Sequence, residues 1–253
     1  MIARLFASRP RSESPAPQLS PGNRVYAIGD IHGCIAPLRQ LHHRIREHAA
    51  DQPVTRNVVV YLGDYVDRGP DSRGVINLLR DEPLAAFERV FLKGNHEASL
   101  LHFLEDEQHG PQWFAYGGDT TLRSYGVHAP RSPTDWVGLQ RAQSEFAQNL
   151  PPEHRSFFAG LQLTHIEDDY LFVHAGLRPG VPLADQNSDD LLWIRDEFLR
   201  SDAEFGKIVV HGHSISEAPT IRPNRIGIDT GAFAGGPLTC LVLEGTSRTF
   251  LTS

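Results

Sequence analysis

The chain has 253 residues and a formal net charge of −7, with 40% apolar and 22% charged residues. This composition excludes collagen-like, coiled-coil and wholly disordered chains, and the length favours one large α/β domain. Only two cysteines are present, Cys34 and Cys240, which excludes a disulfide framework and favours reduced thiols. Thirteen histidines stand against a single methionine. Because histidine is the commonest metal ligand and titrates near neutral pH, the positions of these residues bear directly on function.

Residues 1–23 are predicted to form a disordered arm, because prolines alternate with serines and little apolar surface is available for a core. The first residues are too poor in apolar side chains for a secretory signal, and no apolar run is long enough to span a membrane. A cytoplasmic location is therefore expected. Four arginines and one glutamate give residues 1–24 a charge of +3, which leaves −10 on the remainder. This negative domain disfavours nucleic acid as a partner.

The chain then alternates short apolar β runs with amphipathic helical stretches. Strands are predicted over 25–28, 58–62 and 90–92, each followed closely by a glycine, and helices over 37–50, 72–80 and 97–104. A βαβαβ order predicts a parallel sheet with right-handed crossovers. Ligands of such sheets bind beyond the carboxyl ends of the strands, which is where the polar residues cluster.

Residues 107–160 lack a strand pattern and are predicted to be a helical insertion, with one helix over 134–149. Trp113 and Tyr116 within it either form a rim over a pocket or simply pack the insertion. Further strands are predicted over 170–173, 208–210, 225–228, 238–243 and 249–251. Parallel units first and mostly antiparallel strands later predict an α/β fold, with two packed mixed β-sheets flanked by helices in one domain over 24–253.

Five polar motifs each follow a β run. They are Gly29-Asp30-Ile31-His32-Gly33, Gly63-Asp64-Tyr65-Val66-Asp67-Arg68-Gly69, Gly94-Asn95-His96-Glu97, His174-Ala175-Gly176 and His211-Gly212-His213. Oxygen and imidazole donors without thiolates suit Mn²⁺, Fe or Zn²⁺ better than a structural all-cysteine zinc site. The glycines permit the tight turns and close backbone approach that place short side chains on an ion.

This ordered set resembles the PPP family of binuclear metallophosphatases, a branch of the calcineurin-like phosphoesterases, and in particular its compact bacterial Ser/Thr phosphatases. The family pattern GDxHG, GDxVDRG, GNHE, HA/GG and a late GH is present in order, and the resemblance covers about residues 24–252. It implies hydrolysis of phosphomonoesters with two divalent metal ions, Mn²⁺ first, with Fe or Zn²⁺ as alternatives.

The resemblance also implies a ligand set. The implied metal ligands are Asp30, His32, Asp64, Asn95, His174 and His213. Asp64 would bridge both metals. In the late motif the family ligand follows the glycine, which selects His213, so His211 is expected to be a neighbour of the site. Asp229, after a late strand, is also expected close to the site.

The remaining roles concern proton transfer and phosphate binding. His96 resembles the general acid of the family, Asp67 the carboxylate that orients it, and Arg68 one phosphate-binding arginine. For the second arginine the segment after the HA/GG motif offers Arg195, with Arg178 as the alternative. The resemblance implies direct in-line attack by a metal-bridging hydroxide, without a phosphoenzyme.

The expected substrates are phosphoserine and phosphothreonine in phosphoproteins or phosphopeptides, with phosphotyrosine as a further substrate. The first alternative is a symmetrical dinucleoside polyphosphate (diadenosine tetraphosphate) hydrolase, an enzyme whose equivalent motif typically has a small residue where Asp67 stands. The second is a non-catalytic, metal-stabilised interaction module, which should have lost a ligand or the acid, whereas none is lost here. The sequence gives no indication of oligomeric state.

Overall fold

The first sheet is built from the N-terminal βαβαβ pattern and the C-terminal hairpin. The computed structural model describes residues 16–81, 84, 86–132 and 134–253. The strand order is β10-β9-β1-β2-β3, in which β1, β2 and β3 are parallel and β9 and β10 antiparallel. The strands are β1 (Asn23–Ile28), β2 (Arg56–Tyr61), β3 (Glu88–Phe91), β9 (Thr239–Glu244) and β10 (Ser247–Thr252).

The second sheet has the order β4-β5-β6-β8-β7. Its strands are β4 (Thr164–Glu167), β5 (Tyr170–Val173), β6 (Ile208–His211), β7 (Thr220–Ile221) and β8 (Arg225–Gly227). The three inner strands are parallel and the two edges antiparallel. The predicted antiparallel preference of the later strands is therefore wrong here. Parallel neighbours need a crossover, and the chain between β5 and β6 includes two short helices, α8 (Ser188–Trp193) and α9 (Asp196–Leu199).

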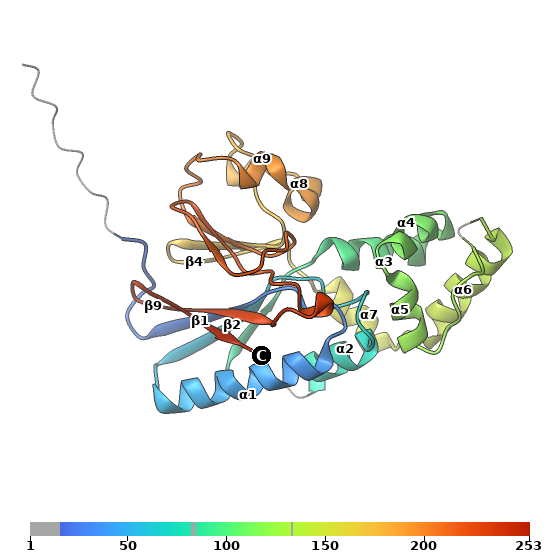
Figure 1. The fold of residues 1–253 in the computed structure, drawn as a ribbon, viewed down its shortest axis with the longest axis horizontal. Coiled ribbons are helices and arrows are strands. Elements are labelled where there is room, and N and C mark those ends of the chain that lie inside the picture. Colours follow the sequence, from blue (N-terminus) through green and yellow to red (C-terminus); the bar gives the residue numbers. More distant parts are fainter. Residues whose placement is uncertain (1–15, 82–83, 85, 133) are drawn as a thin grey trace, which may run out of the picture.

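The two sheets pack face to face with helices outside (Figure 1). Apolar side chains of both sheets form the inner core, among them Val60 and Leu241 of the first sheet and Phe172 and Val210 of the second. The helices α1 (Ile35–Asp51) and α2 (Ser72–Asp81) lie along the outer face of the first sheet, and α8 and α9 beyond the second (Figure 1). The predicted architecture of two mixed sheets flanked by helices in one domain is confirmed.

The predicted helical insertion forms a separate lobe of helices beside the sheets (Figure 1). It follows α3 (Asn95–Glu105), which starts at the third motif. Its elements are η1 (Glu107–His109), α4 (Gly110–Ala115), α5 (Gly118–Ser124), α6 (Trp136–Asn149) and α7 (Pro152–Ala159). Two further 3-10 turns lie elsewhere, η2 (Leu183–Asp185) and η3 (Ala232–Ala234).

The structure bears on only part of the predicted arm, because residues 1–15 lie outside the described residues. Residues 16–22 pack on the domain. Leu19 is 1% exposed and belongs to the core between the sheets. The backbone N–H of Ser20 donates to the Asp168 carboxylate at 2.7 Å, and that of Gln18 to Asp169 at 3.0 Å. The packed chain thus begins ahead of the predicted boundary at residue 24, because the buried Leu19 and these hydrogen bonds hold the segment on the domain.

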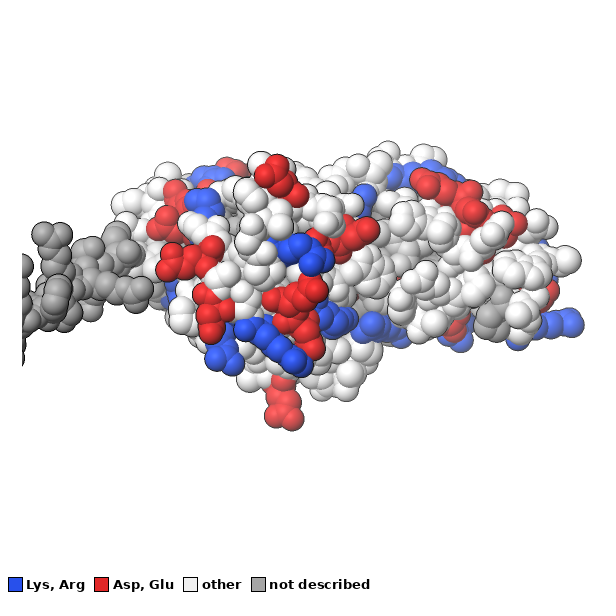
Figure 2. Space-filling view, turned by 90° about the horizontal axis from the view of Figure 1, so that it is seen from above, with Lys and Arg blue, Asp and Glu red and all other residues white. Residues whose placement is uncertain are grey.

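None of the described helices is long and apolar enough to cross a membrane. On the face seen in Figure 2, acidic and basic side chains are interspersed over the surface, and no continuous basic stripe is visible. That face lacks the electrostatic feature that nucleic-acid binding commonly uses.

Candidate active site

The five motifs meet at one edge shared by the two sheets. The predicted ligands of the first sheet follow β1, β2 and β3, and those of the second follow β5 and β6. All of them are at most 5% exposed: Asp30, His32, Asp64, Asn95, His174 and His213. Side chains far apart in the sequence are therefore collected in one buried polar cluster.

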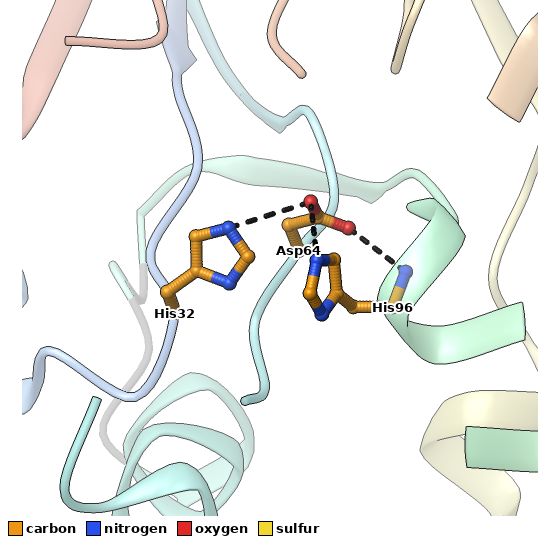
Figure 3. Close-up of side chains that lie close together, drawn as sticks. All are labelled: His32, Asp64 and His96. Carbon is orange, nitrogen blue, oxygen red and sulfur yellow. Dashed lines mark hydrogen bonds and ion pairs between the residues drawn. The ribbon is translucent and has the colours of Figure 1, made fainter. Parts of the chain in front are cut away.

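Asp64 lies at the centre of this cluster. Figure 3 shows the imidazoles of His32 and His96 directed at its carboxylate. Asp64 Oδ2 is 3.5 Å from His32 Nε2 and 3.8 Å from His96 Nε2. Its other oxygen, Oδ1, is 3.5 Å from His174 Nε2 and accepts a hydrogen bond from the His96 backbone N–H. One carboxylate thus faces two groups of donors, as a bridging ligand must.

The second group of donors surrounds the side-chain oxygen of Asn95. This oxygen lies 2.8 Å from His174 Nε2 and 2.9 Å from His213 Nδ1. His174 Nδ1 is fixed by the backbone carbonyl of Leu62 at 2.9 Å. The ligand atoms of Asp64, His174 and His213 lie within 4.8 Å of one another, as do those of His32, Asp64 and His96. Two neighbouring cation sites that share Asp64 are compatible with this arrangement.

Asp30 lies beside the cluster with its carboxylate against the late motif. Both of its oxygens accept from the backbone N–H of His213, at 3.0 and 3.2 Å. A Cβ on Gly212 would lie 2.1 Å from Asp30 Oδ1, so only glycine permits this approach. Asp229, expected near the site, is close enough to Asp30 for its charge to raise the pKa of the Asp30 carboxyl. The contact between Asp30 and the late motif therefore joins the first and last of the five motifs.

The electrostatics of the cluster fit bound cations. Burial raises the pKa of both Asp30 and Asp64, and neighbouring carboxylates raise them further. Burial lowers the pKa of His174 to about 3 and also depresses those of His32 and His213, which leaves neutral imidazoles that can act as ligands. Buried carboxylates beside neutral histidines are costly alone, and a divalent cation offsets that cost.

His96 and Asp67 form a hydrogen-bonded pair next to Asp64. His96 Nδ1 lies 2.7 Å from Asp67 Oδ2, and both side chains are at most 1% exposed. Burial raises the pKa of Asp67 to about 7, whereas burial and the charges of Arg68 and Arg195 lower the pKa of His96 to about 3. The pair fixes the ring, so that Nε2 faces the Asp64 side of the cluster.

The predicted arginines differ in their surroundings. The Arg68 guanidinium lies over the ring of Phe233, 4.5 Å from its centroid. Arg195 donates to the backbone carbonyl of His213 at 3.2 Å and to Ser214 Oγ at 3.3 Å. Arg178 instead forms ion pairs with Asp190 at 2.6 Å and Glu197 at 2.7 Å. Arg68 and Arg195 therefore lie at the cluster, while carboxylates neutralise Arg178.

The backbone of the site is unusual. Among the described residues, six other than glycine have a clearly positive φ, and five of these are predicted site residues. They are His32 (46°), Asp64 (52°), Asp67 (70°), Arg68 (66°) and His213 (62°). A left-handed residue with a side chain costs about 1–2 kcal/mol, so such residues persist only where surrounding contacts enforce them. This clustering supports a functional reading of the motifs independently of their sequence.

Glu97 supplies part of that enforcement. Its buried carboxylate accepts from the backbone N–H groups of Asp64 at 2.9 Å, Tyr65 at 2.7 Å and Gly94 at 2.9 Å. It ties the loop after β2 to the start of α3. A Cβ on Gly94 would lie 2.1 Å from Asp64 Oδ1, so this junction also requires glycine.

Sequence reasoning missed two residues that contact the site, Thr121 and Phe233, and left the role of Trp113 open between a rim and packing. Trp113 and Thr121 hydrogen-bond to Asp67, and Phe233 packs on Arg68 and on the His32 ring. Trp113 was expected only as a rim or as packing, and Thr121 and Phe233 belong to no recognised motif. His211, expected as a neighbour of the site, packs its ring on Phe198 with centroids 5.1 Å apart.

The calcineurin-like phosphoesterase family model matches residues 23–232 of this chain. The chain therefore belongs to this family, whose members use divalent metal ions, and its relatives agree with a PPP-type metallophosphatase. Hydrolysis of phosphoesters is the activity that this membership supports.

Two relatives differ in the substrates that their names give. The chain is 30% identical over 220 residues to serine/threonine-protein phosphatase 1 of Salmonella typhimurium, covering 85% of this chain and 89% of the relative. It is 25% identical over 234 residues to the asymmetrical bis(5'-nucleosyl)-tetraphosphatase PrpE of Bacillus thuringiensis, covering 85% and 88%. These similarities leave the substrate open between phosphoproteins and dinucleotides.

Solved structures show the same fold. A candidate diadenosine tetraphosphatase aligns with a TM-score of 0.60 at 24% identity, covering 94% of this chain and 98% of the other. A cold-active protein tyrosine phosphatase aligns with a TM-score of 0.59 at 17% identity, covering 99% and 88%. At these identities the likeness concerns the arrangement of sheets and helices alone.

Proposed function

We propose that this chain is a metal-dependent phosphomonoesterase that removes phosphate from phosphoserine and phosphothreonine in proteins, with phosphotyrosine as a further substrate. The observation that carries the proposal is the buried Asp67–His96 pair, 2.7 Å apart, beside Asp64. An alkoxide is a poor leaving group, so a serine or threonine phosphomonoester needs a proton donor at the leaving oxygen. A diphosphate bond, as in a dinucleoside polyphosphate, has a better leaving group and depends less on such a donor.

In this proposal the pair acts as a general acid with a fixed orientation. Asp67 Oδ2 accepts the Nδ1–H of His96, which leaves Nε2 free to donate a proton to the leaving oxygen. Burial and two arginines disfavour the imidazolium in the free site. A bound phosphate dianion would offset the arginine charges, so substrate binding itself favours the protonated ring.

Arg68 and Arg195 would bind the phosphoryl oxygens. A planar guanidinium presents paired donors that match phosphate geometry. Arg68 rests on an aromatic face, and among the described residues Arg195 donates through Nη1 to the backbone carbonyl of His213 and to Ser214 Oγ. Arg178 is held between two carboxylates. Of the two alternatives for the second arginine, these contacts support Arg195.

The six predicted ligands would hold two divalent ions, with Mn²⁺ the first expectation. When bound, such ions neutralise phosphoryl charge and lower the pKa of a coordinated water. The chain is acidic overall, so binding of an anionic substrate must depend on local positive charge. The two arginines supply that charge on the protein side.

A second candidate function is hydrolysis of dinucleoside polyphosphates. The observation in its favour is the similarity to the Bacillus thuringiensis tetraphosphatase over most of both chains. That relative is of the asymmetrical type, whereas the sequence resemblance pointed to the symmetrical type as the alternative.

A direct comparison decides between the two. The Mn²⁺-loaded protein is given a phosphoserine peptide, a phosphothreonine peptide and diadenosine tetraphosphate, and kcat/KM is measured for each. We expect the phosphopeptides to be preferred by at least about tenfold, a difference of about 1.4 kcal/mol in transition-state binding. A preference for the dinucleotide, with its cleavage products identified, would overturn the proposal.

A further inference from the structure

The helical insertion supplies most of the side-chain contacts to Asp67. Asp67 is fully buried, and its Oδ2 accepts from Trp113 Nε1 at 2.8 Å as well as from His96 Nδ1 at 2.7 Å. Its Oδ1 accepts from Thr121 Oγ1 at 2.6 Å. Both Trp113, in α4, and Thr121, in α5, belong to the insertion.

The insertion also holds the backbone at this position. The N–H of Asp67 donates to Thr121 Oγ1 at 2.9 Å, and the N–H of Arg68 donates to the carbonyl of Gly117 at 3.2 Å. Both Asp67 and Arg68 are left-handed, with φ of 70° and 66°. Two consecutive strained residues need external contacts to persist, and the insertion accepts a backbone hydrogen bond from each of them.

Trp113 is itself locked in place. Its ring is fully buried and lies 4.9 Å from Phe103 and 5.9 Å from Phe146, centroid to centroid. A Cβ on Gly118 would lie 2.4 Å from the indole, so the neighbouring turn leaves room for this ring only because it has glycine there. The aromatic contacts fix where the single indole N–H points, which is at Asp67.

We propose that Trp113 and Thr121 are positioning residues that orient the Asp67 carboxylate and, through it, the His96 ring for proton donation. This inference rests on the proposed function, because it requires His96 to act as the general acid. Trp113 has a role beyond packing, since its N–H and the His96 ring share one carboxylate oxygen. Loss of either hydrogen bond frees Asp67 to rotate and weakens the alignment of His96.

Conservative variants separate positioning from packing. Trp113→Phe keeps an aromatic ring among Phe103 and Phe146 but removes the N–H. Thr121→Val removes the hydroxyl at nearly equal volume, whereas Thr121→Ser retains it. Phe146→Leu is the matched control, because it perturbs the packing around Trp113 without touching Asp67. Thermal unfolding of each variant reports whether it folds. If Trp113→Phe does not fold, the comparison of Thr121→Val with Thr121→Ser provides the test.

The decisive readout is dependence on the leaving group. An aryl phosphate with a strongly acidic phenol needs little protonation, whereas phenyl phosphate needs a general acid. We expect Trp113→Phe and Thr121→Val to lower kcat about tenfold for phenyl phosphate, to change it less than about twofold for the dinitrophenyl ester, and to leave KM unchanged. Thr121→Ser and Phe146→Leu should show no such difference between the two esters.

His96→Asn distinguishes a failure of the proposed general acid from a failure of the positioning role. If His96→Asn does not lower kcat more for phenyl phosphate than for the dinitrophenyl ester, His96 is not the general acid, and the positioning role fails with it. If it shows the dependence, adding Trp113→Phe should cause no further loss. An equal loss of kcat for both esters in Trp113→Phe and Thr121→Val, or an additive loss in the double variant, would overturn the positioning role while leaving the proposed function intact.

Discussion

The loops at the strand ends and the helical insertion meet at the same site but contribute different things. The strand-end loops are short and glycine-rich, and they carry the predicted metal ligands, the proposed acid His96 and the proposed phosphate-binding residue Arg68. The insertion presents no predicted ligand, yet it fixes Asp67 through Trp113 and Thr121. The groups expected to touch substrate therefore lie mainly in the loops, while contacts that hold Asp67 and Arg68 come from the neighbouring lobe. Changes in the loops should therefore have larger effects than changes behind them.

The largest effect is expected for Asp64→Asn. Removing the charge of the carboxylate that faces both donor groups should abolish metal binding at both positions. Activity should fall at least about 1,000-fold, because metal assistance contributes several kcal/mol. Metal content by mass spectrometry and phosphopeptide turnover measure this. Asp185→Asn, at an exposed position, is the control. Two bound ions together with nearly full activity in Asp64→Asn would contradict the assignment of Asp64 as the shared ligand.

His96→Asn should have the next largest effect. Loss of a general acid typically costs about 100-fold or more in kcat. The metal content should stay unchanged, because His96 is proposed as the acid and not as a ligand. The test is sharp because the ligand atoms of His96, His32 and Asp64 lie close enough together to hold a metal ion between them. A variant that loses a metal ion in parallel with activity would reassign His96 as a ligand.

Arg68→Ala should weaken catalysis less. Hydrogen bonds to a charged group contribute about 1.5–3 kcal/mol, and the lower end of this range, about 1.5–2 kcal/mol, corresponds to a fall in kcat/KM of about 10- to 30-fold. Arg178→Ala is the matched comparison. The Arg178 guanidinium is already paired with Asp190 and Glu197, so its removal should leave kcat/KM nearly unchanged. Steady-state kinetics with a phosphopeptide decide. Equal losses in the two variants would be inconsistent with the assigned roles.

Phe233→Leu should have the smallest effect of this series. The ring supports Arg68 by a cation–π contact worth about 0.5–1 kcal/mol, without using any guanidinium N–H. We expect a rise in KM of about threefold with little change in kcat, and recovery in Phe233→Tyr. A loss confined to kcat would mean that Phe233 acts through His32, whose ring it also contacts.

Much of this fold could be predicted from the sequence, because buried parallel strands form continuous apolar runs. Tyr170–Val173 is such a run, and β5 has these bounds. The edge strand Thr164–Glu167 was missed, since it is short and polar and none of its residues is fully buried. The parallel pairing of β5 with β6 was missed because the crossover helices α8 and α9 are only six and four residues long and give little periodic signal. That of β6 with β8 was missed because the chain between them contains the short strand β7 and no helix.

The candidate site likewise contains residues that the sequence predicts and residues that only the tertiary fold brings there. Asp64 and His213 could be predicted because a motif places each beside a glycine at a strand end. Trp113 and Thr121 could not, because their contacts to Asp67 depend on how the insertion folds back across the β2 loop. Their separation from Asp67 is 46 and 54 residues, and no local pattern encodes it. Phe233 likewise reaches Arg68 only through the tertiary fold.

Titration of the metal-free protein with Mn²⁺ tests the central claim most directly. Bound metal and phosphopeptide hydrolysis are followed together as Mn²⁺ is added. The account predicts two ions per chain and full activity only when the second is bound, since Asp64 is shared between two donor groups. Full activity with one ion, or hydrolysis by the metal-free chain, would contradict it.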